Sequence, residues 1–504
     1  MEHTLEHSEH LADANPTDIE AVIVGGGMSG IRTAIELKRK GVRFILLERS
    51  DGLGGVWNHN RYPGIGCDVP SPTYQYGFAL NDWSRLFASG QEIREYLERV
   101  AAENDIVRHV RFGTELIDSV WSDSEKRWLC ETNKGSIRAQ FLIVATGQND
   151  RASIPYIPGT DKFEGDIFHS HDWPADFDAE GKRIAVVGTG ASAIQFVPEI
   201  QPQAERLVVL QRTPSWIVPK PDVVHEPRSK WRAHLRQRVL RAFIWALLEV
   251  VVLTVKYPRL AALPERAARK HLEQSIADPG LRKVLTPDYK AGCKRLLLSN
   301  AWYPAVSASN VDYVPSALSE IRENSVITAT GREFEVDAII WGTGFNFGSP
   351  VFDRIRDRNG RVLAERFEDM PRTYRATTIV DCPNFFLVGG VHSGTASVFI
   401  GCEAQARYVG SAIQIMQRQG IETVEPKPDV EQTWMDRRDS YLSGFVFTTG
   451  CNTYYLNSKG HNLAMWPGQP LGMVRKLRKF DIKNYQVTAT SNVSSSEEAL
   501  RAAG

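Results

Sequence analysis

The sequence predicts an α/β fold with two Rossmann-like dinucleotide-binding domains and a helical insertion. Short apolar runs that end in small-residue turns begin at Ala21, Phe141, Ile184 and Ala338, a pattern typical of buried parallel strands. Two of these runs, from Ala21 and from Ile184, continue through a glycine-rich turn into a helical pattern. Each is therefore a predicted βα unit for a nucleotide. The segment 217–289 has long helical periodicity and few strand features, which predicts the insertion.

The composition is that of an ordinary globular enzyme with more than one domain. Of 504 residues, 42% are hydrophobic, and 60 lysines and arginines balance 60 aspartates and glutamates, so nothing indicates nucleic-acid binding or bulk disorder. The six cysteines form no CxxC pair and no metal-ligand spacing. We therefore expect no disulfide framework, no metal site and a cytoplasmic location. Residues 1–18 and 489–504 are expected to be disordered tails.

The first glycine-rich turn is predicted to bind the pyrophosphate of a nucleotide. Gly25 makes the tight turn, Gly27 lets the backbone approach the phosphates, and Gly30 permits close packing of the following helix. Glu48 ends the next predicted strand, where its carboxylate can accept hydrogen bonds from an unphosphorylated ribose, as in FAD or NAD. The alternative, a glycine-rich turn without a ligand, is disfavoured because strand, helix and acid occur together.

The second glycine-rich turn, with Gly188 and Gly190, is predicted to bind NADPH. The strand after it ends in Arg212, where an acid would otherwise hold the ribose. Because a guanidinium attracts a 2′-phosphate, Arg212 favours NADPH over NADH; an ordinary surface arginine is the alternative. Hydroxyl groups that can donate to the phosphates are those of Thr189, Ser192 and Thr213.

Between the two turns, the segment from Phe163 to Pro174 follows the pattern FxGxxxHxxxWP, with its histidine at His169. Judged from the residues alone, His169 is as consistent with packing as with catalysis. The pattern resembles the fingerprint of the type I Baeyer-Villiger monooxygenases, members of the flavin-containing monooxygenase superfamily. Its Trp173-Pro174 ending separates it from the sister flavin-containing monooxygenases.

Similarity to that family extends from about Ala21 to Tyr485. The similar segments are Gly54–Trp57, Asn60–Gly64, Cys67-Asp68, Ala145–Gly147, Gly292–Arg295, Gly342–Phe345 and Glu403–Tyr408. The resemblance implies FAD and NADPH as cofactors. We expect an FAD domain at 19–150 and 346–488, an NADP domain at 151–216 and 290–345, and the insertion at 217–289. Departures at Gly66 and at Gly389–His392 leave the substrate open.

The function that the resemblance implies is insertion of one atom of O2 next to a ketone carbonyl, through a C4a-peroxyflavin, to give an ester or lactone. Arg295 is the expected catalytic arginine, because a permanently charged guanidinium stabilises anionic oxygen. Asp68 is expected to orient Arg295 beside the flavin; without the resemblance it would be a carboxylate that caps a turn. Lys294 is expected at the NADPH phosphate or ribose, beside Arg212.

Other expectations concern the flavin pocket and the substrate. Gly55 lies in the segment similar to the one that lines the flavin, and Trp57 and Tyr74 are expected to pack on or near the isoalloxazine, although such aromatics are equally often core residues. A lipophilic ketone is the expected substrate. The alternatives are oxygenation of sulfur or nitrogen by the same flavin, and a flavoprotein that does not oxygenate.

A last feature is the apolar run from Ala242 to Val255, which is shorter than the about 20 residues that span a bilayer. Basic residues from Arg228 to Arg241 precede it without an acid. A buried helix of the insertion is the favoured interpretation. The alternative is an amphipathic helix that touches a membrane surface and passes lipophilic substrate to the site.

Overall fold

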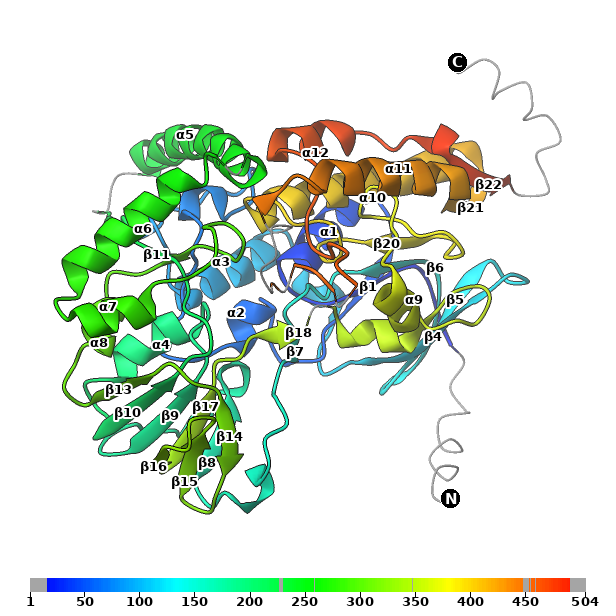
Figure 1. The fold of residues 1–504 in the computed structure, drawn as a ribbon. Helices are drawn as coiled ribbons and strands as arrows, with labels where there is room; N and C mark the ends of the chain where they lie inside the picture. The colour runs from blue at the N-terminus through cyan, green and yellow to red at the C-terminus, as the bar shows by residue number, and fades with distance from the viewer. Residues whose placement is uncertain are drawn as a thin grey trace, which may run out of the picture.

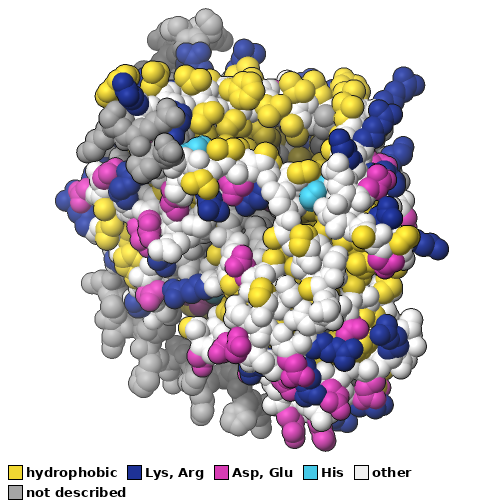
Figure 2. All heavy atoms as spheres, turned by 90° about the vertical axis from the view of Figure 1, so that its left-hand side faces the viewer, with side chains coloured by type: hydrophobic (Ala, Val, Ile, Leu, Met, Phe, Trp, Pro, Cys, Tyr) yellow, Lys and Arg dark blue, Asp and Glu magenta, His cyan; other side chains and the backbone are white. Residues whose placement is uncertain are grey.

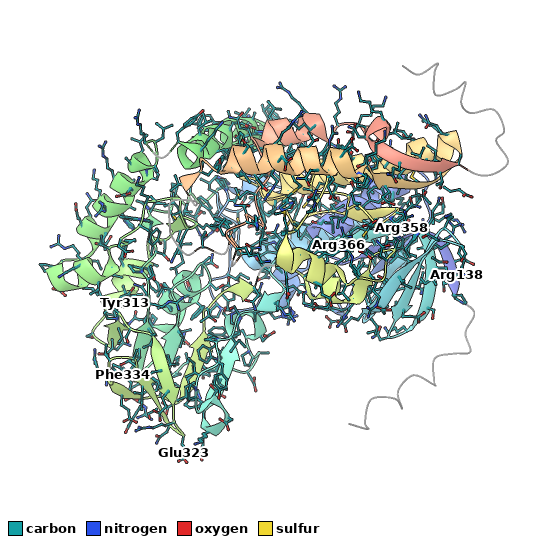
Figure 3. All side chains as sticks on the ribbon, turned by 45° about the vertical axis from the view of Figure 1, so that its right-hand side comes forward. Arg138, Tyr313, Glu323, Phe334, Arg358 and Arg366 are labelled. Carbon is teal, nitrogen blue, oxygen red and sulfur yellow. The ribbon has the colours of Figure 1, made fainter. Side chains whose placement is uncertain are left out.

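Two α/β domains lie side by side, and long helices lie along the upper edge of the molecule (Figure 1). The computed structural model describes residues 16–225, 230–257, 259–346, 348–446, 453, 455–457 and 459–489. In Figure 3, Arg358 and Arg366 mark one domain, and Tyr313 and Phe334 mark the other. Within the described part of the chain, no helix is long and apolar enough to cross a lipid bilayer.

The first domain is built on an eight-stranded sheet, in the order β19-β4-β5-β6-β1-β2-β3, with β20 paired to β6. Its centre is β1 (Thr17–Val24), parallel to β2 (Phe44–Leu47) and β6 (Gly135–Val144). The other strands are β3 (Val110–Arg111), β4 (Leu116–Ser122), β5 (Arg127–Thr132), β19 (Ile355–Arg356) and β20 (Phe385–Leu387). Alternate side chains of β1 point to opposite faces of the sheet and pack into two different hydrophobic cores. Both faces are buried at β1, which lies inside the sheet.

Helices cover one face of this sheet. They are α1 (Met28–Arg39), α3 (Gly90–Glu103) and α10 (Val398–Gln419), whose apolar residues share a core with Ile23 and Phe141. The remaining elements of this part are α2 (Val56–His59), α9 (Leu363–Asp369), α11 (Pro428–Leu442), α12 (Pro470–Lys476), β21 (Ile421–Pro426) and β22 (Tyr485–Ala489). The first domain is thus formed by two distant parts of the chain.

The second domain has a five-stranded sheet in the order β13-β10-β9-β17-β8. All four neighbouring pairs are parallel. The strands are β8 (Asp166–His169), β9 (Arg183–Val187), β10 (Arg206–Leu210), β13 (Val311–Val314) and β17 (Ala338–Trp341). The α/β class with two Rossmann-like domains is therefore confirmed, with the predicted runs from Ala21, Phe141, Ile184 and Ala338 in parallel strands.

Different layers cover the two faces of the second sheet. Helices α4 (Ala193–Ile200) and α8 (Trp302–Val306) pack on one face. An antiparallel sheet that was not among the expected elements covers the other: β14 (Leu318–Ile321), β15 (Ser325–Thr328) and β16 (Glu333–Glu335). These strands have only three or four residues each, and the burial of β14 and β15 does not alternate regularly, so they leave no clear period in the sequence.

Two short ladders join the parts of the chain. β7 (Arg151–Ala152) and β18 (Phe345–Asn346) run antiparallel where the chain passes between the domains. β11 (Ile217–Val218) and β12 (Leu297–Leu298) pair at the base of the helical segment. That segment contains α5 (Lys230–Lys256), α6 (Ala262–Ser275) and α7 (Pro279–Leu285).

Three expectations need correction. The expected tail 1–18 ends inside β1, because Asp18 forms a two-pronged ion pair with Arg138 of β6 that extends the strand; residues 1–15 and 490–504 lie outside the described residues. Cys293 is disulfide-bonded, which spacing along one chain does not reveal. Helix α5 is buried on one face only, because the domain beneath it covers only that face.

Candidate functional site

The turn after β1 leaves bare backbone on which a pyrophosphate can lie. Gly25 has a φ of +107°, and a Cβ there would lie 2.8 Å from the carbonyl oxygen of Ala145. At Gly30 a Cβ would lie 1.8 Å from the oxygen of Gly25, which only glycine allows. Gly27 is the N-cap of α1 and faces Gly55, with 3.4 Å between its added Cβ and the Gly55 Cα. The turn therefore keeps side chains away from the N-terminus of α1.

Glu48 is held beside this turn at the end of β2. Its Oε2 accepts a hydrogen bond of 2.6 Å from the backbone of Gly26, and its Oε1 accepts two of 2.8 Å from Ser50. The carboxylate is thereby oriented to accept from a ribose diol as well. Thr146, next to Gly25, has a buried hydroxyl without a partner in the described residues. A bound nucleotide would supply that partner, so these residues fit FAD.

Aromatic side chains line the next part of the site. The rings of Trp57 and Tyr74 meet edge to face at 5.7 Å and 86°, and Tyr74 meets Phe399 at 4.8 Å. Burial raises the pKa of Tyr74 well above its ordinary value, while the nearby charge of Arg295 acts against the rise. Tyr74 is therefore a neutral phenol within the field of Arg295.

Arg295 and Asp68 form an ion pair across the domains. The Arg295 Nη2 donates to Asp68 Oδ1 over 2.6 Å, and the side chains are 43% and 24% exposed, respectively. A pair this exposed contributes about 1 kcal/mol or less to stability, so its importance lies in the orientation of the guanidinium. The Asp68 carboxylate thus has a partner outside its own turn.

The FxGxxxHxxxWP segment has a structural explanation. Gly165 lies just before β8, where a Cβ would be 2.2 Å from the oxygen of Asp337. His169 ends β8 and its Nδ1 accepts from the backbone of His171 over 3.1 Å. Trp173 packs against Phe168 at 5.2 Å, and also against Phe177 and Phe196. His169 is thus a buried cap of a short turn, and no contact in the described residues gives it a catalytic role.

The second glycine-rich turn repeats the close approach seen at the first. Gly188 has a φ of +100°, and a Cβ there would lie 2.5 Å from the oxygen of Gly342; a Cβ at Gly190 would be 3.7 Å from the same oxygen. Ser192 follows as the N-cap residue of α4, and its hydroxyl makes no capping hydrogen bond. The Ser192 side chain is hydrogen-bonded to Tyr62, and its contact with a phosphate stays a prediction.

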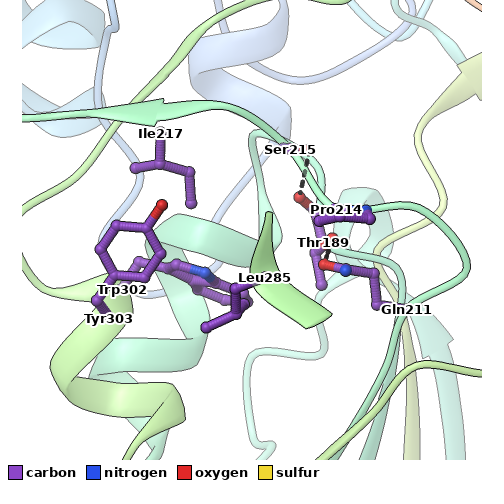
Figure 4. Close-up of a pocket in the computed structure, with 8 residues that line it drawn as sticks. All are labelled: Thr189, Gln211, Pro214, Ser215, Ile217, Leu285, Trp302 and Tyr303. Atoms are coloured by element: carbon purple, nitrogen blue, oxygen red, sulfur yellow. Dashed lines mark hydrogen bonds between the residues drawn. The ribbon is translucent and has the colours of Figure 1, made fainter. Parts of the chain in front are cut away.

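The Thr189 hydroxyl has a partner within the protein, and its contact with a phosphate stays a prediction. Figure 4 shows Thr189 and Gln211 side by side at the edge of a small hollow, with Trp302 and Tyr303 opposite. The Thr189 hydroxyl donates to Gln211 Oε1 over 2.7 Å. Because a hydroxyl has one hydrogen, Thr189 cannot at the same time donate to a phosphate in this arrangement. Gln211, which directly follows β10, is not among the residues expected at the site.

Two cations meet at the end of β10. Burial lowers the pKa of Lys294, and the adjacent charge of Arg212 lowers it further. Arg212 is exposed just after β10, and Thr213 follows it, half-buried. A lysine and an arginine that lie close together repel each other. An anion such as a 2′-phosphate bound beside both would reduce this repulsion. These residues fit NADPH.

Three side chains that could bind a metal also gather near the fingerprint segment. His59, His171 and Asp172 place their ligand atoms within 4.8 Å of one another, and the two imidazole rings lie 4.0 Å apart. The Nδ1 of His171 is hydrogen-bonded to Asn60 Oδ1 at 2.8 Å. Burial, and then the neighbouring His59, lower the pKa of His171 to about 4. Mutual contacts account for this arrangement, and we assign no metal to it.

Sequence analysis missed Gln195, which joins the two domains beside the site. On α4, its Oε1 accepts from the Tyr62 hydroxyl over 3.0 Å, and its Nε2 donates to the oxygen of Gly66 over 2.9 Å. A Cβ at Gly64 would lie 2.6 Å from the Gln195 oxygen. The pattern that could have indicated this contact is the glycine-containing segment 62–66, since such glycines often mark a close approach of backbones.

Comparison with known proteins agrees with this geometry. Residues 19–454 match the family described as flavin-binding monooxygenase-like. A Baeyer-Villiger monooxygenase of Streptomyces coelicolor is 38% identical over 480 residues, which cover 93% of this chain and 92% of the relative. One of Pseudomonas aeruginosa is 36% identical over 515 residues, with 99% and 98% covered. The crystal structure of OTEMO in complex with FAD and NADP has a TM-score of 0.85 at 25% identity, and the match covers 94% of this chain and 100% of that one.

Proposed function

We propose roles for individual residues in the reaction of this protein. The chain belongs to the flavin-binding monooxygenase-like family. The protein is an FAD- and NADPH-dependent monooxygenase of the Baeyer-Villiger type. It inserts one atom of O2 next to a ketone carbonyl to give an ester or lactone, and the other atom leaves as water with electrons from NADPH. Oxygenation of sulfur or nitrogen is not favoured.

We assign the two nucleotides to the two domains. FAD would bind residues 19–150 and 346–488, at Gly25, Gly27, Gly30, Glu48 and Gly55. NADPH would bind residues 151–216 and 290–345, with 217–289 as the helical insertion. When bound, FAD activates O2 and NADPH supplies the hydride. The backbone cradles at Gly25 and Gly188 support this division, because each lies at the end of a central parallel strand.

The ion pair between Arg295 and Asp68 carries the catalytic part of the proposal. Arg295 would stabilise the negative charge that develops on the carbonyl oxygen of the substrate. Asp68 would hold the guanidinium in place through the 2.6 Å hydrogen bond. Trp57 and Tyr74 would form the wall against which the flavin ring and a lipophilic ketone pack. Being neutral and buried, Tyr74 would add no competing charge.

The selectivity for NADPH would come from Arg212 and Lys294, whose charges lie close enough to lower the pKa of Lys294. Ser192 and Thr213 would donate to the nucleotide, since the Ser192 hydroxyl makes no capping bond at the start of α4. A cytoplasmic location remains part of the proposal. The free, buried thiols of Cys67, Cys130, Cys382 and Cys402 support it, and the bonded Cys293 is the observation against it.

Replacement of Arg295 tests the catalytic assignment. In Arg295→Ala, ester formation from a panel of cyclic, linear, aromatic and steroid ketones should fall on the order of 10²-fold or more, because one preorganised donor is lost. Anaerobic reduction of the flavin by NADPH should stay within about threefold, since the pair Arg212 and Lys294 is intact. The control is Arg266→Ala, on an exposed part of α6. Undiminished ester formation by Arg295→Ala would contradict the assignment.

A further inference from the structure

Helix α5 carries apolar side chains on the face that points away from the protein. They recur every three or four positions and are Trp231, Leu235, Val239, Phe243, Leu247, Val250 and Val251. Phe243 is 68% exposed and Leu247 50%, whereas Ile244 and Leu248 on the opposite face are buried. Figure 2, which looks at the side where α5 lies, shows hydrophobic side chains gathered in a band along the upper edge.

An ordinary surface helix turns charged residues outward and apolar residues inward, whereas α5 carries apolar residues on both faces. From 242 to 251 the only charged side chain is Glu249. Its Oε1 is occupied, because it accepts hydrogen bonds from Trp245 Nε1 over 2.9 Å and from the backbone of Leu471 over 2.8 Å. The outward face of this stretch therefore carries no charge, although it is long and exposed.

Cations border the apolar stripe. At its beginning, Arg232 and Arg238 are exposed on α5 itself. Beside its far end lies α12, which the bond from Leu471 to Glu249 ties to α5. The exposed cations on and just after α12 are Arg475, Lys476, Arg478 and Lys479. An apolar strip bordered by lysines and arginines is complementary to an anionic lipid surface, which offers acyl chains beneath a layer of phosphates.

We propose that α5 docks this enzyme on the surface of an anionic lipid bilayer, with the helix in the plane of the interface. The apolar side chains from Trp231 to Val251 enter the boundary between headgroups and acyl chains. The cations of α5 and α12 remain at the level of the phosphates. The helix lies on the membrane and does not cross it, in agreement with the lack of a spanning helix among the described residues.

A second copy of this chain is a weaker occupant of the same face. A twofold interface places the same patch on both subunits. It would bring Arg232, Arg238 and the cations of α12 of the two copies to one interface, and α5 offers no free acid to pair with them. Lipid phosphates neutralise those charges directly, which is why the bilayer is favoured.

Docking would bring the bilayer close to the candidate site. On the inner side of α5, the Arg241 Nη1 donates to the carbonyl oxygens of Pro72 and Gln75 over 3.1 and 2.9 Å. Between these two residues lies Tyr74, which the proposed function places at the flavin. Only the thickness of one helix, about 10 Å, then separates a ketone dissolved in the bilayer from this segment. This consequence rests on the proposed function, whereas the docking itself does not.

Flotation of the FAD-loaded enzyme with lipid vesicles tests the proposal. The enzyme should float with vesicles of phosphatidylcholine and phosphatidylglycerol, and less with phosphatidylcholine alone. Added salt should weaken the binding. Phe243→Glu combined with Leu247→Glu should lower the bound fraction about tenfold or more, because two charges enter the apolar layer. Arg475→Glu combined with Lys479→Glu should remove the dependence on phosphatidylglycerol. The matched control is Tyr156→Glu, at a side chain 91% exposed outside α5 and α12.

Several outcomes would overturn the proposal. These are no flotation of the wild type with either vesicle, or equal flotation of the wild type and the Phe243/Leu247 double variant. Light scattering that shows a dimer broken by the same double variant, without vesicle binding, would assign the face to a second copy. Flavin content and melting temperature establish that each variant is folded. Flotation needs no ketone, so its failure leaves the proposed function intact, and loss of the catalytic assignment leaves the docking intact.

Discussion

Lys294 shows how a single side chain can indicate a ligand. Burial lowers the pKa of its ammonium group and Arg212 lowers it further. Both the burial and the repulsion between the two cations disfavour the charged form of Lys294. Its ammonium lies 4.9 Å from the centre of the Tyr289 ring, which limits where the side chain can turn. A dianionic 2′-phosphate between Lys294 and Arg212 would offset the repulsion, whereas NADH, with a free hydroxyl, would not.

Lys294→Met should therefore affect the two coenzymes differently. We expect the KM for NADPH to rise about tenfold, because a charge-assisted hydrogen bond of about 1.5–3 kcal/mol is lost. The KM for NADH should change less than about twofold. Steady-state coenzyme oxidation measures both values. Lys290→Met, at an exposed neighbour, is the control. Equal rises for NADPH and NADH would place Lys294 elsewhere on the nucleotide.

At the scale of elements, β8 explains why the fingerprint segment needs its glycine. β8 is an edge strand of the second sheet, paired with β17 in the register Asp166 to Ala338. Just before it, Gly165 approaches the oxygen of Asp337 so closely that an added Cβ would lie at 2.2 Å. The Asp337 oxygen belongs to the backbone, so the strands themselves would have to separate. Phe163 and Trp173 then anchor the two ends of the segment in two different cores.

Gly165→Ala should destabilise the second domain by about 1–3 kcal/mol, the usual range for an overpacked site. The measurement is the melting temperature of the FAD-loaded enzyme, with the NADPH-driven rate recorded alongside. Gly472→Ala is the control, because nothing lies within 4 Å of a Cβ at that position of α12. That change should be neutral or slightly stabilising, since alanine favours helix over glycine. An unaltered melting temperature in Gly165→Ala would show that β8 can shift without cost.

For the molecule as a whole, the relative position of the two domains is the feature on which the reaction depends. Hydride transfer requires the two nucleotides to meet, and a misplacement of about 1 Å can cost on the order of 10²-fold in rate. Gln195 of α4 joins the domains through Tyr62 and Gly66, and the pair Arg295 and Asp68 adds a second connection. Both connections lie next to the candidate site.

Gln195→Leu keeps the volume of the side chain and removes both hydrogen bonds. We expect flavin reduction by NADPH to slow by about tenfold, because the nicotinamide is held less precisely against the flavin. The melting temperature should change by only a few degrees, since each bond contributes about 1 kcal/mol. Stopped-flow absorbance measures the reduction. Gln203→Leu is the control, because the Gln203 amide donates to the carbonyl oxygen of Glu199 in its own domain and not to the other domain. Wild-type reduction in Gln195→Leu would remove its positioning role.

The sequence by itself determined the two βα units and the family. The apolar runs from Ala21 and Ile184, their glycines and the residues Glu48 and Arg212 lie close together along the chain, so local patterns suffice to predict them. The expectation that Arg295 and Asp68 cooperate came from resemblance, because no local pattern connects positions 227 residues apart. The short strands β14 to β16 escaped prediction for lack of a clear period.

Only the tertiary structure decided how these parts meet. In the folded chain Arg295 pairs with Asp68, and the hydroxyl of Thr189 donates to Gln211. Gln195 contacts the segment 62–66. The tertiary structure also turned the apolar stripe of α5 outward, where the pattern of apolar residues alone favoured burial. The physical reason is the same in each case. Periodicity specifies which face of an element is apolar, but burial depends on whether another part of the chain covers that face.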